Sequence, residues 1–298
     1  MILYLTNQKI KENMNIKWLV QHSSVSDTHL TNVVESIKKS KTKYDFFGVI
    51  PFCQEITGLE DCLEKDTCYV IHGSVKILDI FSKTNSLTET NPNLNNWQKS
   101  MDEILLKRLK SGIFHDKNLF DQRFYNKLDL PILNKDSQIL SCSEQLDTKF
   151  DEDLFIKPSS DTKAFDAGII PKGISIKEHI ESGFYKEHYK NEFILISSLK
   201  DIKAEYRFFV VDKKVISGSS YRINGHLKST QEIPENVSAA AIEFSQMYQP
   251  ADVFTMDLAI VDNTVRIVEY NCFNCSGIYA TDYSKVVKAV NNHILKNL

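Results

Sequence analysis

Two lysines flank a short polar loop in the middle of the chain. Lys157 ends the apolar stretch 154–157, Pro158 stops it, and the polar residues 159–163 follow, ending in Lys163. A lysine fixed at a strand end, with backbone N–H groups and a second lysine beyond it, suits a polyphosphate, because that ligand needs spread positive charge and close approach of the backbone. A strand followed by an ordinary polar loop explains the same residues, so this segment alone does not decide.

Two of the chain's arginines lie in successive apolar stretches. Glu205 and Arg207 are two residues apart, so in a strand they point to the same face, and Arg222 follows in the next stretch. Two arginines that converge on one anion are one interpretation, since planar guanidinium groups bind phosphate and carboxylate with paired hydrogen bonds. The alternative is a cross-strand ion pair, worth about 0.2–1 kcal/mol.

Three oxygen-bearing side chains mark a predicted hairpin near the C-terminus. Its strands, at 254–261 and 264–269, are joined by an Asp-Asn turn that places Asp257 nearly opposite Glu269, while Asn271 shares the face of Glu269. Oxygen ligands on one patch suit Mg²⁺. Apolar neighbours mark both strands as buried, so a cation would offset the cost of burying two carboxylates. The alternative to a metal site is that these three side chains are polar residues at the end of the hairpin that face solvent.

The cysteines and histidines predict no zinc site. Cys272 and Cys275 have the CxxC spacing, but no second CxxC or paired histidine completes the set, and two small residues in a tight loop explain them better. The turn Gly73-Ser74 precedes a predicted helix and offers N–H groups to an anion, although an ordinary strand-to-helix turn explains it equally well. His72 before it is interpreted as structural.

The elements that must position these residues differ between the two parts of the chain. In the N-terminal third, apolar runs predict buried strands at 16–20, 44–50 and 68–71. Apolar stripes at helical spacing predict helices at 33–37, 75–81 and 97–109. The polar stretch 85–96 predicts a loop. This alternation indicates an α/β fold with a small parallel sheet.

The second half is richer in strands. Besides the hairpin, it predicts strands at 154–157, 168–170, 192–197, 205–211 and 215–220. Ser175 and Glu178 form a capping box for a helix that ends near residue 181. Further helices are predicted at 238–246 and 283–294. Strands with few helices between them indicate an α+β fold with antiparallel sheets.

Composition and charge limit the class of protein. The 298 residues include 36 Lys+Arg and 39 Asp+Glu, a net charge of −3, with 42% hydrophobic residues, which is an ordinary globular composition and excludes disorder as the main state. A near-neutral chain is a poor polyanion binder, so we expect no nucleic-acid partner. No apolar stretch approaches the ~18 residues of a membrane span, and the start lacks the pattern of a signal peptide. We therefore expect a cytoplasmic protein with reduced cysteines and no membrane partner.

In their order along the chain, these motifs resemble those of the ATP-grasp superfamily: a strand lysine, a phosphate loop, an E-x-R strand, and an aspartate followed by Glu-x-Asn. Similarity to the clade whose signature is two arginines and a lysine extends over the segments YDFFGVIPFCQEITG, CYVIHGSVKIL, FIKPSSDTKAFDAGII, AEYRFFVVDKKVISGSSYR and FTMDLAIVDNTVRIVEYNCFNCSGIY. The resemblance implies a smaller α/β domain, residues 1–125, ahead of an ATP-grasp domain, residues 126–298, whose two α+β subdomains hold ATP between them.

The resemblance also implies a nucleotide site. Lys157 and Lys163 would bind the ATP phosphates, and the loop with Ser159 and Ser160 would close over them. The backbone of a linker would bind the adenine edge, at Ile196, Ser197, Ser198 and Leu199. Asp201 would contact the ribose.

The implied catalytic and metal residues are those of the arginine and hairpin motifs. Arg207 and Arg222, together with Lys163, would bind the transferred phosphate or the acceptor carboxylate. Asp257, Glu269 and Asn271 would hold one or two Mg²⁺ ions.

The activity that the resemblance implies is ATP- and Mg²⁺-dependent ligation of a carboxylate to an amine. The carboxylate would be activated as an acyl phosphate, and ADP and phosphate would be released. Metabolites, peptides or proteins could supply the two groups. The alternatives are phosphoryl transfer to a hydroxyl group by the same site, and a non-catalytic ATP-binding module.

Overall fold

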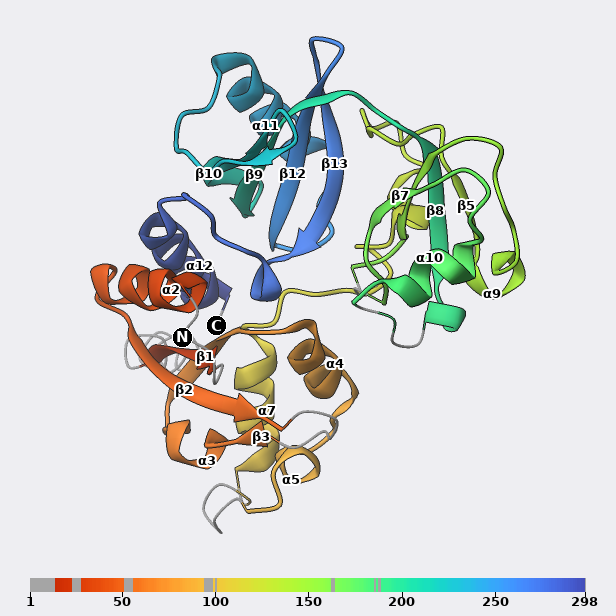
Figure 1. Cartoon of the computed structure of the whole chain (residues 1–298). Coiled ribbons are helices and arrows are strands. Elements are labelled where there is room, and N and C mark those ends of the chain that lie inside the picture. Colours follow the sequence, from red (N-terminus) through yellow and green to blue (C-terminus); the bar gives the residue numbers. More distant parts are fainter. Residues whose placement is uncertain are drawn as a thin grey trace. The chain divides into compact units, whose positions relative to one another are not determined.

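The computed structural model describes residues 14–22, 28–50, 56–93, 99, 101–161, 164–184, 186 and 189–297. Their contacts divide the chain into two compact units, whose elements are labelled in Figure 1. The first unit contains Met1–His115, Phe209–Gly218 and Phe273–Leu298, and the second contains Asp116–Phe208 and Ser219–Cys272. The predicted division after residue 125 stays a prediction. The predicted fold class, an α/β N-terminal part followed by antiparallel sheets, is confirmed.

A four-stranded sheet forms the centre of the first unit, in the order β3-β2-β1-β4. Its strands are β1 (Asn15–Gln21), β2 (Lys43–Val49), β3 (Ile56–Thr57) and β4 (Thr67–His72). β1 pairs in parallel with β2 and β4, as the alternation of strands and helices predicted. The short β3, which no apolar run announced, pairs antiparallel with β2.

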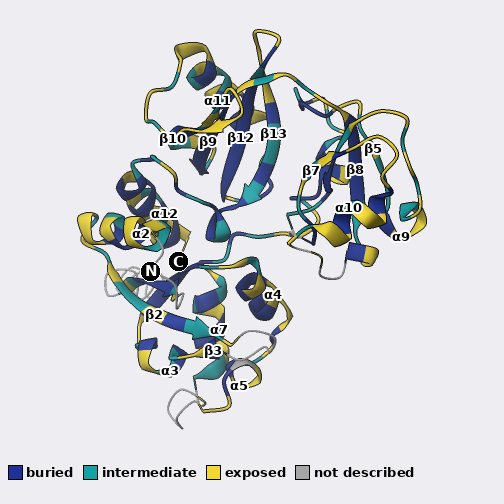
Figure 2. Ribbon diagram, viewed as in Figure 1, coloured by how far each residue is buried: buried dark blue, intermediate teal, exposed yellow. Residues whose placement is uncertain are grey.

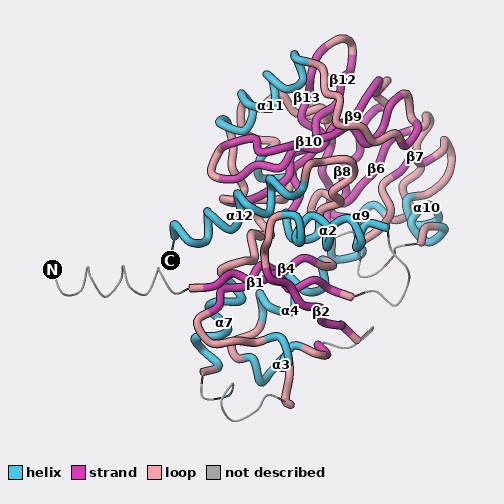
Figure 3. The backbone as a smooth tube through the Cα atoms, turned by 90° about the vertical axis from the view of Figure 1, so that its left-hand side faces the viewer, coloured by secondary structure: helices cyan, strands magenta, loops and turns pink. Residues whose placement is uncertain are grey.

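Helices cover both faces of this sheet. On one face, α2 (Thr28–Lys39) and α12 (Tyr283–Asn297) pack side by side (Figure 3). Trp18 of β1 points to them and donates a hydrogen bond from Nε1 to Asn291 Oδ1 (2.9 Å). On the other face, Leu19 shares a core with residues of α4 (Val75–Lys83) and α7 (Asp102–Lys110). Trp18 and Leu19 are neighbours in β1 and therefore point to opposite faces of the sheet, where each contacts one layer of helices.

Among its described residues, the first unit also has the short helices α3 (Leu59–Cys62) and α5 (Leu87–Thr90) and the 3₁₀ helix η2 (Phe273–Cys275). The prediction of a loop over 85–96 was wrong where α5 forms. Ser86 is the reason, because its Oγ accepts a hydrogen bond from the backbone N–H of Thr88 (3.1 Å) and so caps the helix.

His72 ends β4 in a buried place. Its Nε2 lies 3.2 Å from Nε2 of His29, and its Nδ1 lies 3.4 Å from the hydroxyl of Tyr283. Burial, assisted by the neighbouring His29, lowers the pKa of His72 to about 3. The interpretation of His72 as structural agrees with this setting, since the folded chain holds the imidazole in its neutral form.

Acid should therefore destabilise the folded chain through His72. Because the folded pKa lies below the unfolded one, the unfolded state gains a proton first as the pH falls, and we expect the free energy of unfolding to drop by about 2 kcal/mol between pH 7 and pH 5. Denaturant titrations at the two pH values would measure it. His72→Asn should reduce this drop, whereas His226→Asn, at an exposed position, should not. Equal drops in the wild type and in His72→Asn would contradict the assignment.

One antiparallel sheet and most of a second, larger one belong to the second unit, while residues 209–218 of the larger sheet are assigned to the first unit. The smaller has the order β5-β8-β6-β7, formed by β5 (Gln138–Ser141), β6 (Leu154–Pro158), β7 (Gly168–Ile170) and β8 (Phe193–Ser198). Its apolar face packs on α9 (Cys142–Gln145), α10 (Ile176–Ser182) and the 3₁₀ helix η1 (Tyr189–Asn191). The predicted capping box at Ser175 and Glu178 is present. The strand β5 was missed, because its four residues are few and only half apolar.

The larger sheet has the order β11-β10-β9-β12-β13. Its strands are β9 (Ile202–Val211), β10 (Lys214–Ile223), β11 (His226–Leu227), β12 (Val253–Val261) and β13 (Thr264–Cys272). α11 (Glu235–Met247) packs on β12 and β13, and α8 (Gln122–Tyr125) precedes the smaller sheet in the chain. Figure 2 shows β12 buried along nearly all its length. Among the described residues, no helix is both long and apolar enough to span a membrane.

Candidate functional site

Lys157 and Glu269 form an ion pair inside the second unit. Ile156 and Pro158 lie opposite Ile196 and Ile194 on the apolar face of the smaller sheet, so Lys157 points to the other face. There its Nζ donates a hydrogen bond to Glu269 Oε2. The side chain of Lys157 is 10% exposed. The fold thus joins the predicted phosphate lysine to a predicted metal ligand that lies 112 residues later in the chain.

The three predicted metal ligands also lie together. β12 and β13 pair so that Asp257 is directly opposite Glu269, as the Asp-Asn turn predicted, with a bulge after Asp257. The amide Nδ2 of Asn271 donates to Glu269 Oε1 (3.1 Å) and lies 3.2 Å from Asp257 Oδ2. One amide therefore bridges the two carboxylates.

Arg207 is bound to Asp257 rather than free for an anion. Its Nε donates to Asp257 Oδ1 (2.8 Å) and its Nη2 to Asp257 Oδ2 (2.7 Å). Both side chains are buried, at 11% and 2% exposure. Two parallel hydrogen bonds from one guanidinium are the strongest geometry for such a pair.

Burial acts on both carboxylates of this cluster, with opposite outcomes. It raises the pKa of Asp257, and the attraction of Arg207 does not cancel that effect. It would also raise the pKa of Glu269, but the charge and hydrogen bond of Lys157 outweigh it and lower that pKa. The two acids repel each other's charge, and each is offset by its own cation, so a metal ion would bind the carboxylates in place of Lys157 and Arg207.

A cavity of about 300 Å³ opens beside the cluster. Lys157, Glu269 and Asn271 line it, together with the loop after β6 and the aromatic rings of Phe120 and Tyr125. The loop supplies two of the predicted phosphate ligands. Ser159 is buried and its Oγ has no hydrogen-bond partner among the described residues, while Ser160 Oγ donates to Glu192 Oε2 (3.1 Å).

The remaining predicted nucleotide residues lie on and after β8. Ile196 and Ser197 are buried, and Ser197 Oγ lacks a partner within the described part of the chain. Ser198 and Leu199 are exposed, and Asp201 pairs with Lys203 (2.6 Å). This segment does not line the cavity. Lys163 lies outside the described residues.

Arg222 forms an ion pair with Glu205, whose carboxylate also binds Tyr221, and the sequence did not single out Glu205 or Tyr221 as a site residue. Its Nε lies 3.5 Å from Glu205 Oε1. The hydroxyl of Tyr221 donates to the other oxygen, Glu205 Oε2 (2.8 Å). The spacing of Glu205 and Arg207 in the E-x-R motif was the available signal for Glu205. Nothing in the sequence marked Tyr221.

The donor set suits a magnesium ion. Asp257, Glu269 and Asn271 offer oxygen ligands within one hydrogen-bonded cluster, and Mg²⁺ completes its shell with water and substrate phosphates. Within the described ranges, no group of three or more His, Cys, Asp and Glu side chains is placed to hold a metal ion. The cluster offers two carboxylates and one amide, so water and the oxygens of a ligand would have to complete the shell of a bound Mg²⁺.

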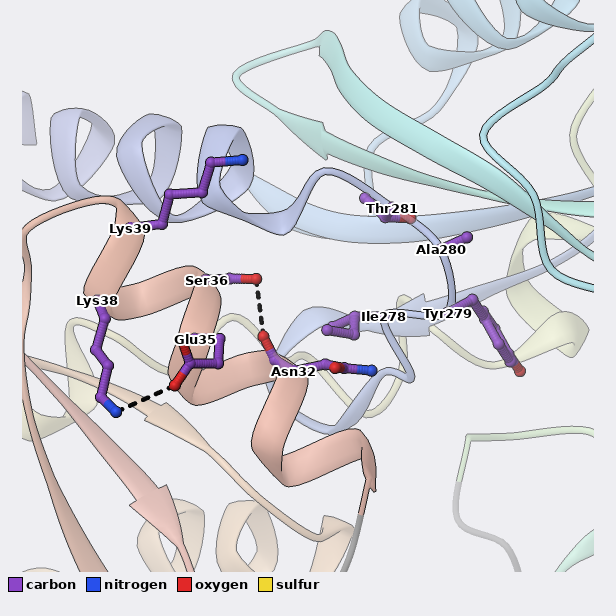
Figure 4. A pocket seen from close by; sticks show the side chains of 9 residues that line it. All are labelled: Asn32, Glu35, Ser36, Lys38, Lys39, Ile278, Tyr279, Ala280 and Thr281. Carbon is purple, nitrogen blue, oxygen red and sulfur yellow. Dashed lines mark hydrogen bonds and ion pairs between the residues drawn. The ribbon is translucent and has the colours of Figure 1, made fainter.

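A second hollow, of about 670 Å³, lies in the first unit between α2 and residues 278–281. Figure 4 shows two interactions among its lining residues: Lys38 pairs with Glu35 (3.1 Å), and Ser36 Oγ donates to the carbonyl oxygen of Asn32 (2.8 Å). The side chain of Tyr279 points away from α2. We assign no ligand to this hollow.

A family model matches the chain over residues 135–289, which include the cluster and the cavity's loop. The model describes an ATP-grasp domain, family 2 of the clade named after two arginines and a lysine. No curated protein matches the chain.

Solved structures of similar fold cover nearly the whole chain. D-alanine–D-alanine ligase from Bacillus anthracis, complexed with ATP, has 16% sequence identity and a TM-score of 0.55, over 95% of this chain and 98% of that one. A second structure of the same ligase has 14% identity and a TM-score of 0.54 over the same shares. At such identities the likeness shows the fold alone.

Proposed function

Because the chain belongs to the two-arginine-and-lysine clade of the ATP-grasp family, as the motifs predicted, we propose that it is an ATP- and Mg²⁺-dependent ligase that joins a carboxylate to an amine. The carboxylate is first phosphorylated to an acyl phosphate, the amine then displaces phosphate, and ADP is the nucleotide product. The named ligase activity of the structurally similar D-alanine–D-alanine ligase supports amide formation as the reaction class.

The observation that carries this proposal is the pairing of cations with acids across the second unit. Lys157 is bound to Glu269 and Arg207 to Asp257, so the groups suited to phosphate neutralise the groups suited to a metal. Asp257 and Glu269 would hold Mg²⁺ bound with ATP, and Lys157 and Arg207 would then be released to bind the phosphates.

The remaining assignments carry over from the family resemblance, whose model covers these residues. Lys157, Ser159, Ser160 and Lys163 bind the phosphates. The backbone of Ile196, Ser197, Ser198 and Leu199 binds the adenine, and Asp201 contacts the ribose. The Oγ atoms of Ser159 and Ser197, which have no hydrogen-bond partner among the residues that the structure describes, support polar ligands on this face of the smaller sheet.

The chemistry explains why such a site is needed. A carboxylate resists attack by an amine because its negative charge lowers its electrophilicity, whereas an acyl phosphate has a good leaving group. Asp257, Glu269 and Asn271 would hold Mg²⁺, which offsets charge on the transferring phosphoryl group. Arg207 and Lys163 stabilise the charge of the phosphoryl group. Arg222 binds the same phosphoryl group or the acceptor carboxylate. The loop after β6 excludes water that would hydrolyse the intermediate.

Product analysis tests the proposal. The full chain is incubated with Mg²⁺, ATP and pairs of amino acids or dipeptides, and nucleotides and products are identified by chromatography and mass spectrometry. We expect ADP, phosphate and an amide that contains both partners. AMP with pyrophosphate would reject the acyl-phosphate route. A stable phosphate ester would instead support the hydroxyl phosphotransferase, and nucleotide binding without any turnover would support the binding module.

A further inference from the structure

A hydrogen bond joins the loop after β6 to β13, in addition to the ion pair of Lys157 and Glu269. Asp161, in that loop, accepts through Oδ2 a hydrogen bond from the backbone N–H of Cys272 (2.9 Å), which lies 111 residues later in the chain. Cys272 ends β13 and directly follows Asn271. The bond therefore connects the loop proposed for phosphate to the strand that carries two of the proposed Mg²⁺ ligands.

The N–H of Cys272 belongs to the outermost strand of the larger sheet. β13 ends the strand order β11-β10-β9-β12-β13, so β12 is its neighbour among the described strands. Backbone N–H groups along an edge strand need acceptors from outside the sheet. A carboxylate is a stronger acceptor for such a group than a neutral oxygen. Asp161 supplies that acceptor at the residue next to Asn271.

The loop end of this link is held by other elements. The N–H of Ser159 donates to the carbonyl oxygen of Phe193 in β8 (2.9 Å), and the carbonyl oxygen of Ser159 accepts from the N–H of Gln122 in α8 (2.8 Å). Ser160 is also bound through its hydroxyl. Because the two residues before Asp161 are fixed, the bond of Asp161 sets the position of the loop relative to β13.

The proposed function opens the ion pair but not this hydrogen bond. Lys157 leaves Glu269 when the nucleotide binds, so the ion pair no longer joins β6 to β13. The bond between Asp161 and Cys272 has no such competitor, because Mg²⁺ binds oxygens and not N–H groups, and because the charge of Asp161 repels phosphate. The bond would therefore keep the loop and the strand together while the ion pair is open.

The position of Asp161 differs from that of the two acids of the metal cluster. Asp161 lines the same cavity as Glu269. It does not form a third carboxylate beside Asp257 and Glu269, since the described part of the chain contains no group of three or more His, Cys, Asp and Glu side chains that could hold a metal ion. Its contribution is therefore to geometry and not to the donor set.

We propose that Asp161 is a positioning residue, whose bond to Cys272 fixes the loop after β6 relative to the Mg²⁺ ligands of β13 and so couples the binding of metal and nucleotide. This role rests on the proposed nucleotide and metal sites. Two ligands that bind to one fixed frame favour each other's binding, whereas a frame that has lost this bond loses part of the coupling free energy.

Amide hydrogen exchange tests the link in the ligand-free chain. The chain has six cysteines, so selective ¹⁵N labelling of cysteine gives few peaks, and the peak missing in Cys272→Ser identifies Cys272. We expect its amide to exchange about tenfold faster in Asp161→Ala than in the wild type, and at nearly the wild-type rate in Asp161→Asn, whose amide oxygen still accepts. Cys68, buried in β4, is the internal reference and should not change. Equal rates at Cys272 in the wild type and in Asp161→Ala would overturn the link.

Binding of a non-hydrolysable ATP analogue tests the positioning role. Calorimetry gives its dissociation constant with Mg²⁺ and with a chelator, and the ratio of the two constants measures the coupling. We expect Asp161→Ala to lower this ratio about tenfold and Asp161→Asn to keep it. Asp151→Ala, at an exposed position before β6, is the matched control and should behave like the wild type. Since Mg²⁺ binds the free analogue equally in every sample, differences between variants report on the protein.

The outcomes separate this role from the proposed function. An unchanged ratio in Asp161→Ala would overturn the positioning role. A ratio lowered equally in Asp161→Asn would overturn it too, because the charge and not the hydrogen bond would then matter. If the analogue did not bind the wild type, the proposed nucleotide site and the positioning role would fail together, while the exchange rates would still decide whether Asp161 holds Cys272.

Discussion

Arg207→Met is expected to lower the free energy of unfolding by about 3–5 kcal/mol, because it leaves the buried Asp257 carboxylate without its cation. The loss is large since both hydrogen bonds of the pair disappear and water cannot replace them. Denaturant unfolding followed by circular dichroism would measure it. Arg266→Met, a change of the same kind at an exposed position of β13, should leave the free energy within about 0.5 kcal/mol.

A double variant separates the missing charge from the missing packing. Arg207→Met combined with Asp257→Leu replaces the buried pair by apolar side chains, which should restore most of the lost stability. The double variant should show no turnover, because it lacks Asp257, a proposed metal ligand. If the double variant were as unstable as Arg207→Met, the unpaired carboxylate would not be the cause of the loss.

Glu269→Gln is expected to reduce ADP release about 10³-fold or more, the largest loss of activity expected for a single substitution. The change removes one of the two carboxylates proposed for Mg²⁺ and leaves Lys157 without the acid that it contacts. Steady-state ADP release at saturating Mg²⁺ and ATP, with the substrate pair found by product analysis, would measure it. Folding should be checked by circular dichroism, because Glu269 is also part of the buried cluster.

Two further variants serve as comparisons for Glu269→Gln. Glu243→Gln neutralises a carboxylate on α11, outside the cluster, and should retain wild-type turnover. Asp257→Asn should resemble Glu269→Gln, since both acids contact the amide of Asn271. Normal ADP release by a folded Glu269→Gln chain would rule out Glu269 as a metal ligand.

Local chemistry made much of the second unit predictable from the sequence. The two-residue turn at Asp262 and Asn263 adopts positive φ angles (49° and 58°), which fix the register of β12 and β13 and so place Asp257 opposite Glu269. The capping box at Ser175 likewise specifies where α10 begins. In such cases the residues that determine the geometry are neighbours in the chain.

Contacts between distant segments were not predictable in the same way. The sequence grouped Lys157 with phosphate and Glu269 with metal, but the ion pair between them depends on how the two sheets of the second unit pack. The pairing of Arg207 with Asp257, in place of a free pair of arginines, depends instead on β9 and β12 being neighbours in the larger sheet although they are not consecutive in the chain. Tyr221 was missed because a tyrosine in an apolar strand looks like an ordinary core residue until its hydroxyl is seen to contact Glu205.

A structure of the chain with Mg²⁺ and a non-hydrolysable ATP analogue would show whether the paired cations and acids form the nucleotide site. We expect Lys157 Nζ to leave Glu269 for a phosphate oxygen, and the metal to lie among oxygens of Asp257, Glu269 and Asn271. A nucleotide bound elsewhere, with the Lys157–Glu269 and Arg207–Asp257 pairs both intact, would contradict it.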